Sequence, residues 1–370
     1  MNSWTRLRER HELLSPSLVI DRGVLLRNLE TMIQIGRGAG RLRPHVKTHK
    51  MPAIVRIFEK AGIEKHKCAT IAEAEMVASA NGRDVLIAYP LVGPNVARLA
   101  ALVRKYPSTV FRAVVDDPDA ARALSDGLSG IDRPLSVLVD LEVGMGRTGI
   151  EPGDRAVALY EQLDQLPNVT PAGLHAYDGH IHESDPVARA ALAGRVSAST
   201  LALRDRLLAK GLPVPRLVMG GTPTFPIHAT LETPGVELSP GTCTLHDVSY
   251  STRYADLKFD IAAALLTRVV SRPRPGRICL DLGHKAVAAD PVGPRVQLLD
   301  MPGATIGNQS EEHLVVDTPE ADRFPPGTPL VAFPMHVCPT CALHRRVTVV
   351  EDGQVVDEWD VLARDRVLNF

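Results

Sequence analysis

The residues with the clearest chemical potential are the lysines and histidines of segment 43–50, Arg-Pro-His-Val-Lys-Thr-His-Lys. A lysine ammonium among other cations is disfavoured, and the neutral amine is then a better nucleophile for a carbonyl carbon. Lys47 is the candidate nucleophile, and His45 is a candidate catalytic residue beside it. A solvated basic loop is the alternative interpretation of this segment.

Two turns rich in small residues are typical of a phosphate-binding site. Each follows a predicted strand, and glycines there let backbone N–H groups approach an anion. In α/β barrels, phosphate is frequently bound by the loops after the seventh and eighth strands. The candidate phosphate-binding residues are Gly220, Gly221, Thr222, Gly241 and Thr242.

Two further strand ends carry polar side chains. Segment 175–182, His-Ala-Tyr-Asp-Gly-His-Ile-His, holds Tyr177 and two candidate catalytic residues, Asp178 and His180. Segment 142–149, Glu-Val-Gly-Met-Gly-Arg-Thr-Gly, offers Arg147 to an anionic oxygen. Its glycine spacing matches a dinucleotide-binding fingerprint, but it lies mid-chain and lacks the acidic residue expected about 20 positions later, so we reject that interpretation.

A candidate metal pair lies near the C-terminus, where His336 and Cys338 follow an apolar run. On an extended segment, residues two apart point to the same side, so both side chains can reach one soft ion such as zinc. Two protein ligands leave coordination positions open, as catalytic metal sites do. Cys341 completes a Cys-x-x-Cys pair, but without a second such pair it does not indicate a zinc ribbon.

Eight apolar runs separated by helix-length segments indicate a parallel α/β fold up to about residue 240. The predicted strands are 41–44, 68–71, 85–88, 110–115, 135–141, 172–176, 216–219 and 236–238. They lack strict polar alternation, as strands buried on both faces do. Amphipathic helices are predicted at 54–60, 95–105 and 187–210. This pattern predicts a (β/α)8 TIM-like barrel, with an open doubly wound sheet as the alternative.

The pattern changes near residue 250, where strands begin to dominate. They are predicted at 261–270, 277–282, 296–299, 314–316, 330–333, 347–350 and 355–359. The Asp-Gly pair between the last two is a strong hairpin signal. We therefore predict a barrel domain, residues 1–250, and a β-rich C-terminal domain, residues 251–370, that carries the metal site. Residues 1–15 are a candidate addition to the C-terminal domain.

The composition is that of an ordinary soluble protein and excludes several kinds of partner. The 370 residues are 45% hydrophobic and 23% charged with a net charge of −1, so neither nucleic acid nor a membrane surface is indicated. The charged N-terminus lacks the apolar core of a signal peptide, and no apolar run approaches the roughly 20 residues of a membrane span. Five cysteines form no disulfide framework in a chain of this length, so we expect a cytoplasmic protein.

Segment 43–50, Arg147, Tyr177 and the Gly220-Gly221 turn resemble the family of D-threonine aldolase and D-serine dehydratase. Members of this family are pyridoxal phosphate enzymes with the fold of alanine racemase. The resemblance implies an alanine racemase-type barrel and a Schiff base of pyridoxal 5'-phosphate (PLP) on Lys47. It also implies cofactor contacts from Arg147, Tyr177 and the glycine turn.

The resemblance extends to segment 281–285 and to the metal pair, and so covers nearly the whole chain. It implies a metal-assisted lyase acting on D-3-hydroxy amino acids, with zinc preferred over manganese or magnesium. Segment 338–344 looks like the aldolase branch, which releases glycine and an aldehyde. Cys338 instead matches the dehydratases, and Asp178 stands where the aldolases tend to carry histidine.

The aldolase activity is the preferred prediction, and a zinc-dependent D-serine or D-3-hydroxyaspartate dehydratase is the alternative. A third possibility is a barrel that binds PLP without turnover, although such proteins are shorter and single-domain. In the resembling fold the β-domain of one subunit completes the barrel mouth of another, so a homodimer is expected. The expected partner is a small D-amino acid substrate.

Overall fold

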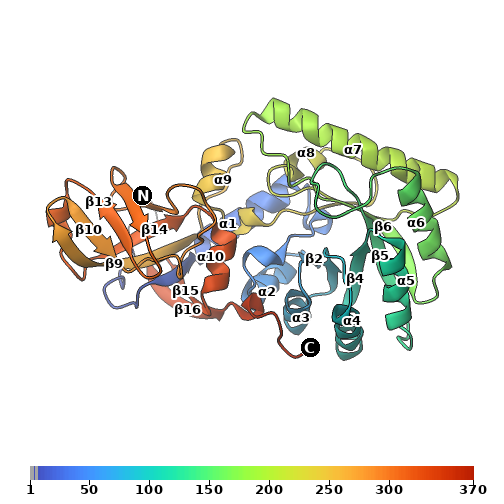
Figure 1. Ribbon diagram of the computed structural model, residues 1–370, viewed down its shortest axis with the longest axis horizontal. Helices are drawn as coiled ribbons and strands as arrows, with labels where there is room; N and C mark the ends of the chain where they lie inside the picture. The colour runs from blue at the N-terminus through green and yellow to red at the C-terminus, as the bar shows by residue number, and fades with distance from the viewer. Residues whose placement is uncertain (1–3, 5–6) are drawn as a thin grey trace. The chain divides into compact units, whose positions relative to one another are not determined.

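The computed structural model describes Trp4 and residues 7–370, which form two compact units (Figure 1). The strand-rich unit consists of the described residues up to Met32, together with Thr48–Met51 and Thr242–Arg364. The half-barrel unit consists of Ile33–Lys47, Pro52–Gly241 and Asp365–Phe370. The chain therefore crosses between the units directly after Lys47 and directly after Gly241.

The half-barrel unit is built on a curled, parallel, seven-stranded sheet in which each strand pairs with the next one along the chain. The strands are β2 (Lys65–Cys68), β3 (Asp84–Ile87), β4 (Val110–Val115), β5 (Leu135–Asp140), β6 (Val169–Ala176), β7 (Leu217–Met219) and β8 (Val236–Leu238). Five neighbouring strands each contribute one buried residue to a common core: Leu86, Val114, Leu138, Ala172 and Val218. The absence of strict alternation in these runs therefore did reflect burial on both faces.

The predicted closed eight-stranded barrel is wrong in one respect, because the expected first strand at 41–44 does not form. Only single bridges, Leu42 to Leu238 and His45 to Lys67, link this segment to β8 and β2. Pro44 has no N–H to extend a ladder, and a 3-10 turn, η3 (Val46–Thr48), begins soon after it. The regular sheet is therefore a half-barrel that is not fully closed.

Helices cover the outer side of this sheet (Figure 1). They are α2 (Pro52–Lys60), α3 (Ile71–Ser79), α4 (Pro94–Lys105), α5 (Pro118–Gly127), α6 (Asp154–Gln165), α7 (Pro186–Ala209) and α8 (Phe225–His228). Helices α2, α4 and α7 confirm the three predicted amphipathic segments. The predicted strand at 68–71 lies three residues too late, because Thr70 caps α3 by accepting a hydrogen bond from the Glu73 N–H at 3.1 Å. A further 3-10 turn, η2 (Ala39–Arg41), precedes the bridged segment.

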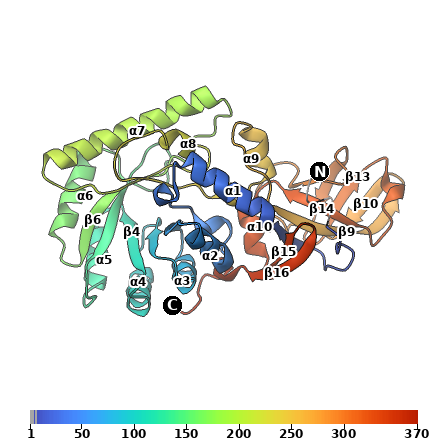
Figure 2. The ribbon, with the colours of Figure 1, turned by 180° about the vertical axis from the view of Figure 1, so that it is seen from behind.

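The strand-rich unit contains a nine-stranded sheet (Figure 2). Its strands are β1 (Ser17–Asp21), β9 (Ala263–Arg274), β10 (Arg277–Leu280), β11 (Val296–Leu298), β12 (Thr305–Gln309), β13 (Leu314–Asp317), β14 (Pro329–Pro334), β15 (Arg346–Glu351) and β16 (Gln354–Asp360). Its helical segments are α9 (Val248–Arg253), α10 (Val337–Leu343), η4 (Thr242–Thr244), η5 (Ala321–Arg323) and η6 (Leu362–Arg364), and α1 (Arg22–Ile35) leads from this unit into the half-barrel.

Seven of these strands match the predicted ones, and β15 and β16 form the predicted hairpin, with positive φ at Asp352 and Gly353. The sequence analysis missed β12 and β1. Strand β1 lies between β9, to which it is antiparallel, and β15, to which it is parallel. Trp4 also packs in this unit, donating its indole N–H to the Ile261 carbonyl at 3.1 Å. Residues 1–3 and 5–6 of the segment predicted to join this unit lie outside the described residues.

One buried ion-pair network anchors the segment that precedes Lys47. The Arg43 side chain is fully buried, and its Nε donates to Glu237 Oε2 at 2.6 Å while one terminal nitrogen donates to Asp84 Oδ1 at 2.8 Å. Burial by itself would raise the pKa of Asp84, but Arg43 and Arg112 lower it to about 2. The network thus ties the irregular segment to both β8 and β3.

Replacing Arg43 by methionine should lower the free energy of unfolding by about 3 kcal/mol, because Glu237 and Asp84 would each lose a buried hydrogen-bonding partner and keep Lys65 and Arg112 as their nearest ion-pair partners. The exposed Arg56 of α2 supplies the control, and Arg56→Met should change stability by less than about 0.5 kcal/mol. Urea denaturation followed by circular dichroism measures both. Equal, small effects for the two variants would contradict the anchoring role.

Candidate active site

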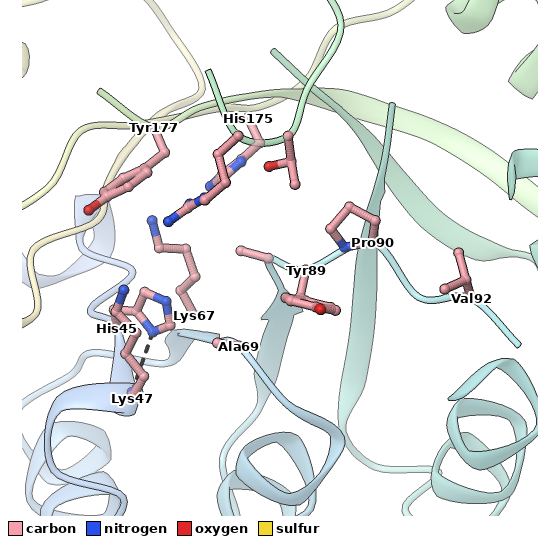
Figure 3. Close-up of a pocket in the computed structure, with 12 residues that line it drawn as sticks. His45, Lys47, Lys67, Ala69, Tyr89, Pro90, Val92, His175 and Tyr177 are labelled. Atoms are coloured by element: carbon pink, nitrogen blue, oxygen red, sulfur yellow. Dashed lines mark hydrogen bonds between the residues drawn. The ribbon is translucent and has the colours of Figure 1, made fainter. Parts of the chain in front are cut away.

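A cavity of about 520 Å³ opens at the carboxyl ends of the half-barrel strands (Figure 3). Predicted site residues from three separate segments line it: His45, Lys47, Arg147 and Tyr177. Lys47 lies on the turn η3, and its backbone N–H donates to His45 Nδ1 at 3.4 Å, which orients the imidazole at the edge of the cavity. The prediction that strand ends would gather these side chains therefore agrees with the geometry.

Tyr177 is the common neighbour of three basic side chains in this cavity. Its ring centroid lies 5.7 Å from Lys47 Nζ, 5.4 Å from Lys67 Nζ and 5.4 Å from the Arg147 guanidinium carbon. At such distances an aromatic face attracts cations. The ring therefore reduces the mutual repulsion of positive charges, and the cavity suits an anionic ligand.

Lys67 is a cavity residue that the sequence analysis missed. It is buried near the end of β2, and burial first and the charge of Lys47 second lower its pKa to about 7. The signal was present, since a strand ending at Cys68 places Lys67 at the barrel mouth. The predicted strand began at Cys68 and thus concealed it.

A buried histidine–aspartate pair forms a second missed feature. His175 Nδ1 lies 2.7 Å from Asp140 Oδ1, and the Thr148 hydroxyl donates to Asp140 Oδ2 at 3.0 Å. Burial lowers the pKa of His175 despite the opposing effect of Asp140, so a neutral ring is favoured. His175 lines the cavity, and its Nε2 is buried without a hydrogen-bond partner among the described residues. This nitrogen is available to a ligand or to a proton.

The structure gives Asp178 and His180 other surroundings than the cavity wall. Asp178 is buried, with Oδ1 accepting from the Thr224 hydroxyl and Oδ2 bonded to His228 Nε2, both at 2.7 Å. It thereby clamps the end of β6 to α8. His180 is half-buried against Gly144, where an added Cβ would lie 2.5 Å from its Nε2.

The predicted phosphate turns meet beside Tyr177. A Cβ on Gly221 would lie 3.2 Å from the tyrosine ring, and a Cβ on Gly220, whose φ is +75°, would lie 2.7 Å from His228. The Thr222 hydroxyl accepts a hydrogen bond from the Gly241 N–H at 3.1 Å, so the turns after β7 and β8 are joined. The lack of Cβ atoms thus lets Tyr177 and His228 pack against the turn after β7. The N–H groups of Gly220 and Gly221 donate to the Ala176 carbonyl and the Thr224 hydroxyl, each at 3.1 Å.

The predicted metal pair lies in the strand-rich unit. His336 caps α10, so Cys338 is a helical residue and the predicted extended geometry is wrong. The two residues nevertheless interact: burial by itself would lower the pKa of His336, but Cys338 and Asp290 raise it to about 9. Within the described chain, no cluster of three or more His, Cys, Asp or Glu side chains forms a metal site.

Further contacts hold each member of this pair. His336 Nδ1 lies 2.5 Å from Asp290 Oδ2, a contact that directs the other ring nitrogen toward the cysteine. The Cys338 thiol donates to the Thr48 hydroxyl at 3.4 Å and lies 3.7 Å from the Thr242 hydroxyl. Thr48 directly follows Lys47, and Thr242, the last predicted phosphate-binding residue, directly follows Gly241.

Comparisons with known proteins identify the family to which this chain is similar. The family model "Alanine racemase, N-terminal domain" matches residues 20–244, and "Putative serine dehydratase domain" matches residues 262–350. D-threonine aldolase from Arthrobacter sp. is 32% identical over 95% of this chain and 92% of its own length. Among the described residues no helix is both long and apolar enough to cross a bilayer.

Solved structures show the same fold across nearly the whole chain. D-threonine aldolase from Filomicrobium marinum superposes with a TM-score of 0.89 at 31% identity, covering 96% of each chain. D-threo-3-hydroxyaspartate dehydratase from Delftia sp. HT23 gives 0.87 at 26% identity, covering 95% of this chain and 98% of that one. A cysteine-to-alanine mutant of such a dehydratase is described in a metal-free form.

The chain belongs to the alanine racemase-like family, in the branch that contains D-threonine aldolase. It is accordingly a PLP-dependent enzyme of the lyase type.

Substituting Gly220 by alanine tests whether the turn after β7, which lies beside Tyr177, contributes to PLP binding. Gly220→Ala should weaken PLP binding at least about tenfold, because the new Cβ would displace His228 from Asp178. Gly211 supplies a matched control, since its φ is +79° and nothing lies within 4 Å of an added Cβ. Gly211→Ala should cost about 1–2 kcal/mol of stability but leave PLP affinity unchanged. Titration of apo-protein with PLP measures the affinities. Equal values for both variants would show that the turn after β7 does not contribute to PLP binding.

Proposed function

We propose that this enzyme is a metal-assisted lyase of the D-threonine aldolase type, which cleaves D-3-hydroxy amino acids to glycine and an aldehyde. The observation that carries this proposal is the cavity in which Lys47, Arg147 and Tyr177 face one another. Its support from relatives is the likeness to D-threonine aldolases in sequence and in fold.

The residues of the cavity fit PLP. Lys47 offers the amine for a Schiff base in the cavity, and the close approach of Tyr177 to Gly221 places the tyrosine ring beside the turn after β7. The turns joined at Thr222 and Gly241 would hold the phosphate through the backbone N–H and the hydroxyl of Thr222, because the Gly241 N–H is already bonded to that hydroxyl. Arg147 would balance negative charge on the cofactor. When bound, PLP supplies an electron sink for the carbanion left at Cα.

Retro-aldol cleavage needs a group that removes the proton of the β-hydroxyl. We assign this role to His175 Nε2, which lies in the cavity wall, while Asp140 holds the opposite nitrogen. A neutral imidazole oriented by a carboxylate is suited to accept a proton. His45 is the second candidate base, whereas both oxygens of Asp178 are already engaged by Thr224 and His228.

His336 and Cys338 would hold the metal, and Asp290 would orient His336. A thiolate ligand favours zinc over manganese or magnesium. The hydrogen bonds of Cys338 to Thr48 and Thr242 fix the metal pair to residues that directly follow Lys47 and Gly241 in the chain. The metal would bind the substrate hydroxyl and acidify it.

A dehydratase is the second candidate, because a Cys-bound zinc is a good Lewis acid for a departing hydroxide. The likeness to D-threo-3-hydroxyaspartate dehydratase supports it. A PLP-binding protein without turnover is the third, and the second unit with its metal pair favours the enzymes over it.

We further propose a homodimer, because in the resembling fold the β-domain of one subunit completes the barrel mouth of another. We also propose a reducing, cytoplasmic location, because all five cysteines are free.

The products from D-threonine distinguish the two enzymes. Holoenzyme supplied with zinc should release glycine and acetaldehyde in equal amounts, with no 2-oxobutanoate. Chromatography of derivatised products measures both outcomes in one sample. Release of 2-oxobutanoate and ammonia would establish the dehydratase instead, and absence of any product would contradict both.

Removal of the metal should abolish turnover and leave the visible absorbance of bound PLP, because the Schiff base needs Lys47 rather than the metal. Cys338→Ala should lose turnover by about two orders of magnitude and lose zinc, as measured by metal analysis after dialysis. Cys341→Ala is the control and should keep both, since Cys341 is buried and the burial raises its pKa. Normal turnover by metal-free protein would disprove the metal's role.

A further inference from the structure

Two lysine amines occupy one cavity, and the proposed function uses only one of them. Lys47 and Lys67 come from η3 and β2, and both side chains extend toward Tyr177 (Figure 3). Their Nζ atoms lie 5.7 and 5.4 Å from the centroid of the tyrosine ring. The backbone N–H of Lys67 donates to the Pro44 carbonyl at 2.9 Å, so Lys67 is fixed beside the segment that presents Lys47.

The carboxylates nearest to Lys67 are already engaged. Asp140 bonds to His175 and Thr148, and Asp178 bonds to Thr224 and His228. Both therefore act on Lys67 only through their charge. The other groups that face the amine carry no carboxylate: Lys47, Arg43, Arg147, His45, His175 and Tyr177.

This environment disfavours the ammonium form of Lys67. Burial contributes most and the charge of Lys47 next, and together they lower the pKa of Lys67 to about 7. At neutral pH a large fraction of Lys67 is thus a neutral amine with a free electron pair. A buried neutral amine beside a second lysine can act as a general base, because it can accept the proton that the second lysine must lose.

We propose that Lys67 is the proton acceptor that frees the Lys47 amine to form the Schiff base with PLP. This inference rests on the PLP site and not on the reaction that follows. Lys47 must be neutral to attack a carbonyl, whereas an ordinary lysine is an ammonium at neutral pH. Proximity of the two amines over one aromatic ring gives the proton a destination inside the cavity.

The step balances without any other reactant. One proton passes from the Lys47 ammonium to the Lys67 amine, directly or through one water molecule. The free pair on Lys47 Nζ then forms a bond to the aldehyde carbon of PLP, and the aldehyde oxygen leaves as water when the C=N bond forms. The proton on Lys67 returns to solvent or to the departing oxygen.

The rate at which PLP enters the apo-protein tests this role without any substrate. Stopped-flow absorbance records the growth of the visible band from about pH 6 to about pH 9. In the wild-type protein the rate should rise with a midpoint near the Lys67 pKa of about 7. In Lys67→Met and Lys67→Gln the rise of the rate near pH 7 should be absent, and the rate at neutral pH should fall at least about tenfold. Both variants remove a buried charge, so folding should be preserved, as a thermal melt verifies.

Two further variants separate proton transfer from simple charge repulsion. Lys67→Arg keeps a cation beside Lys47 but cannot accept a proton at these pH values, so its rate should also be low. Lys60→Met, at the exposed end of α2, should match the wild type. Wild-type rates in Lys67→Met, or restoration of the rate by arginine, would overturn the proposal. A wild-type protein that never forms the band would instead refute the PLP site itself, whereas missing lyase activity would leave this inference untouched.

Discussion

The buried Arg43 guanidinium is the interaction on which the rest of the site depends. The segment that presents Lys47 has no regular ladder, because Pro44 cannot donate a hydrogen bond and only single bridges join it to β8 and β2. Arg43 compensates by bonding Glu237 and Asp84, which belong to β8 and β3. A buried charge whose partners lie on separate strands fixes direction as well as distance. The Lys47 turn therefore begins from a rigid base although its own backbone is irregular.

The electrostatics of the cavity follow from where its carboxylates are used. The carboxylate oxygens of Asp140 and Asp178 are each hydrogen-bonded to a histidine and a threonine, so neither carboxylate forms an ion pair with a lysine. Tyr177 offers an aromatic face to Lys47, Lys67 and Arg147 instead. A cavity with surplus positive charge attracts anions, and both the cofactor and a substrate carboxylate are anionic. Burial, and second the charge of Lys47, lower the pKa of Lys67 to about 7. The positive charge that favours the cofactor therefore also favours a neutral Lys67 amine beside Lys47.

Much of this site could be predicted from sequence, because barrel chemistry gathers at strand ends and the strand ends could be located by composition. Lys47, Arg147, Tyr177 and the glycine turns were found in this way, and the structure brings them together. Features that depend on the exact ends of strands and helices could not be predicted from the sequence. A displacement of three residues in β2 hid Lys67, and the start of α10 at Val337 replaced the extended geometry expected for His336 and Cys338. Pairing partners distant in sequence, such as β1 between β9 and β15, leave no local signal. The clamp formed by Asp178 likewise depends on α8, some 50 residues later.

The identity of the lysine that carries PLP tests this account most directly. Two amines share the cavity, and we propose that Lys47 binds the cofactor and that Lys67 accepts the proton. Borohydride reduction of the PLP-loaded protein, followed by digestion and peptide mapping by mass spectrometry, locates the covalent label. The account predicts the label on Lys47, and on Lys47 also in Lys67→Met protein that has been given time to react. A label on Lys67 in the wild-type protein would contradict the account.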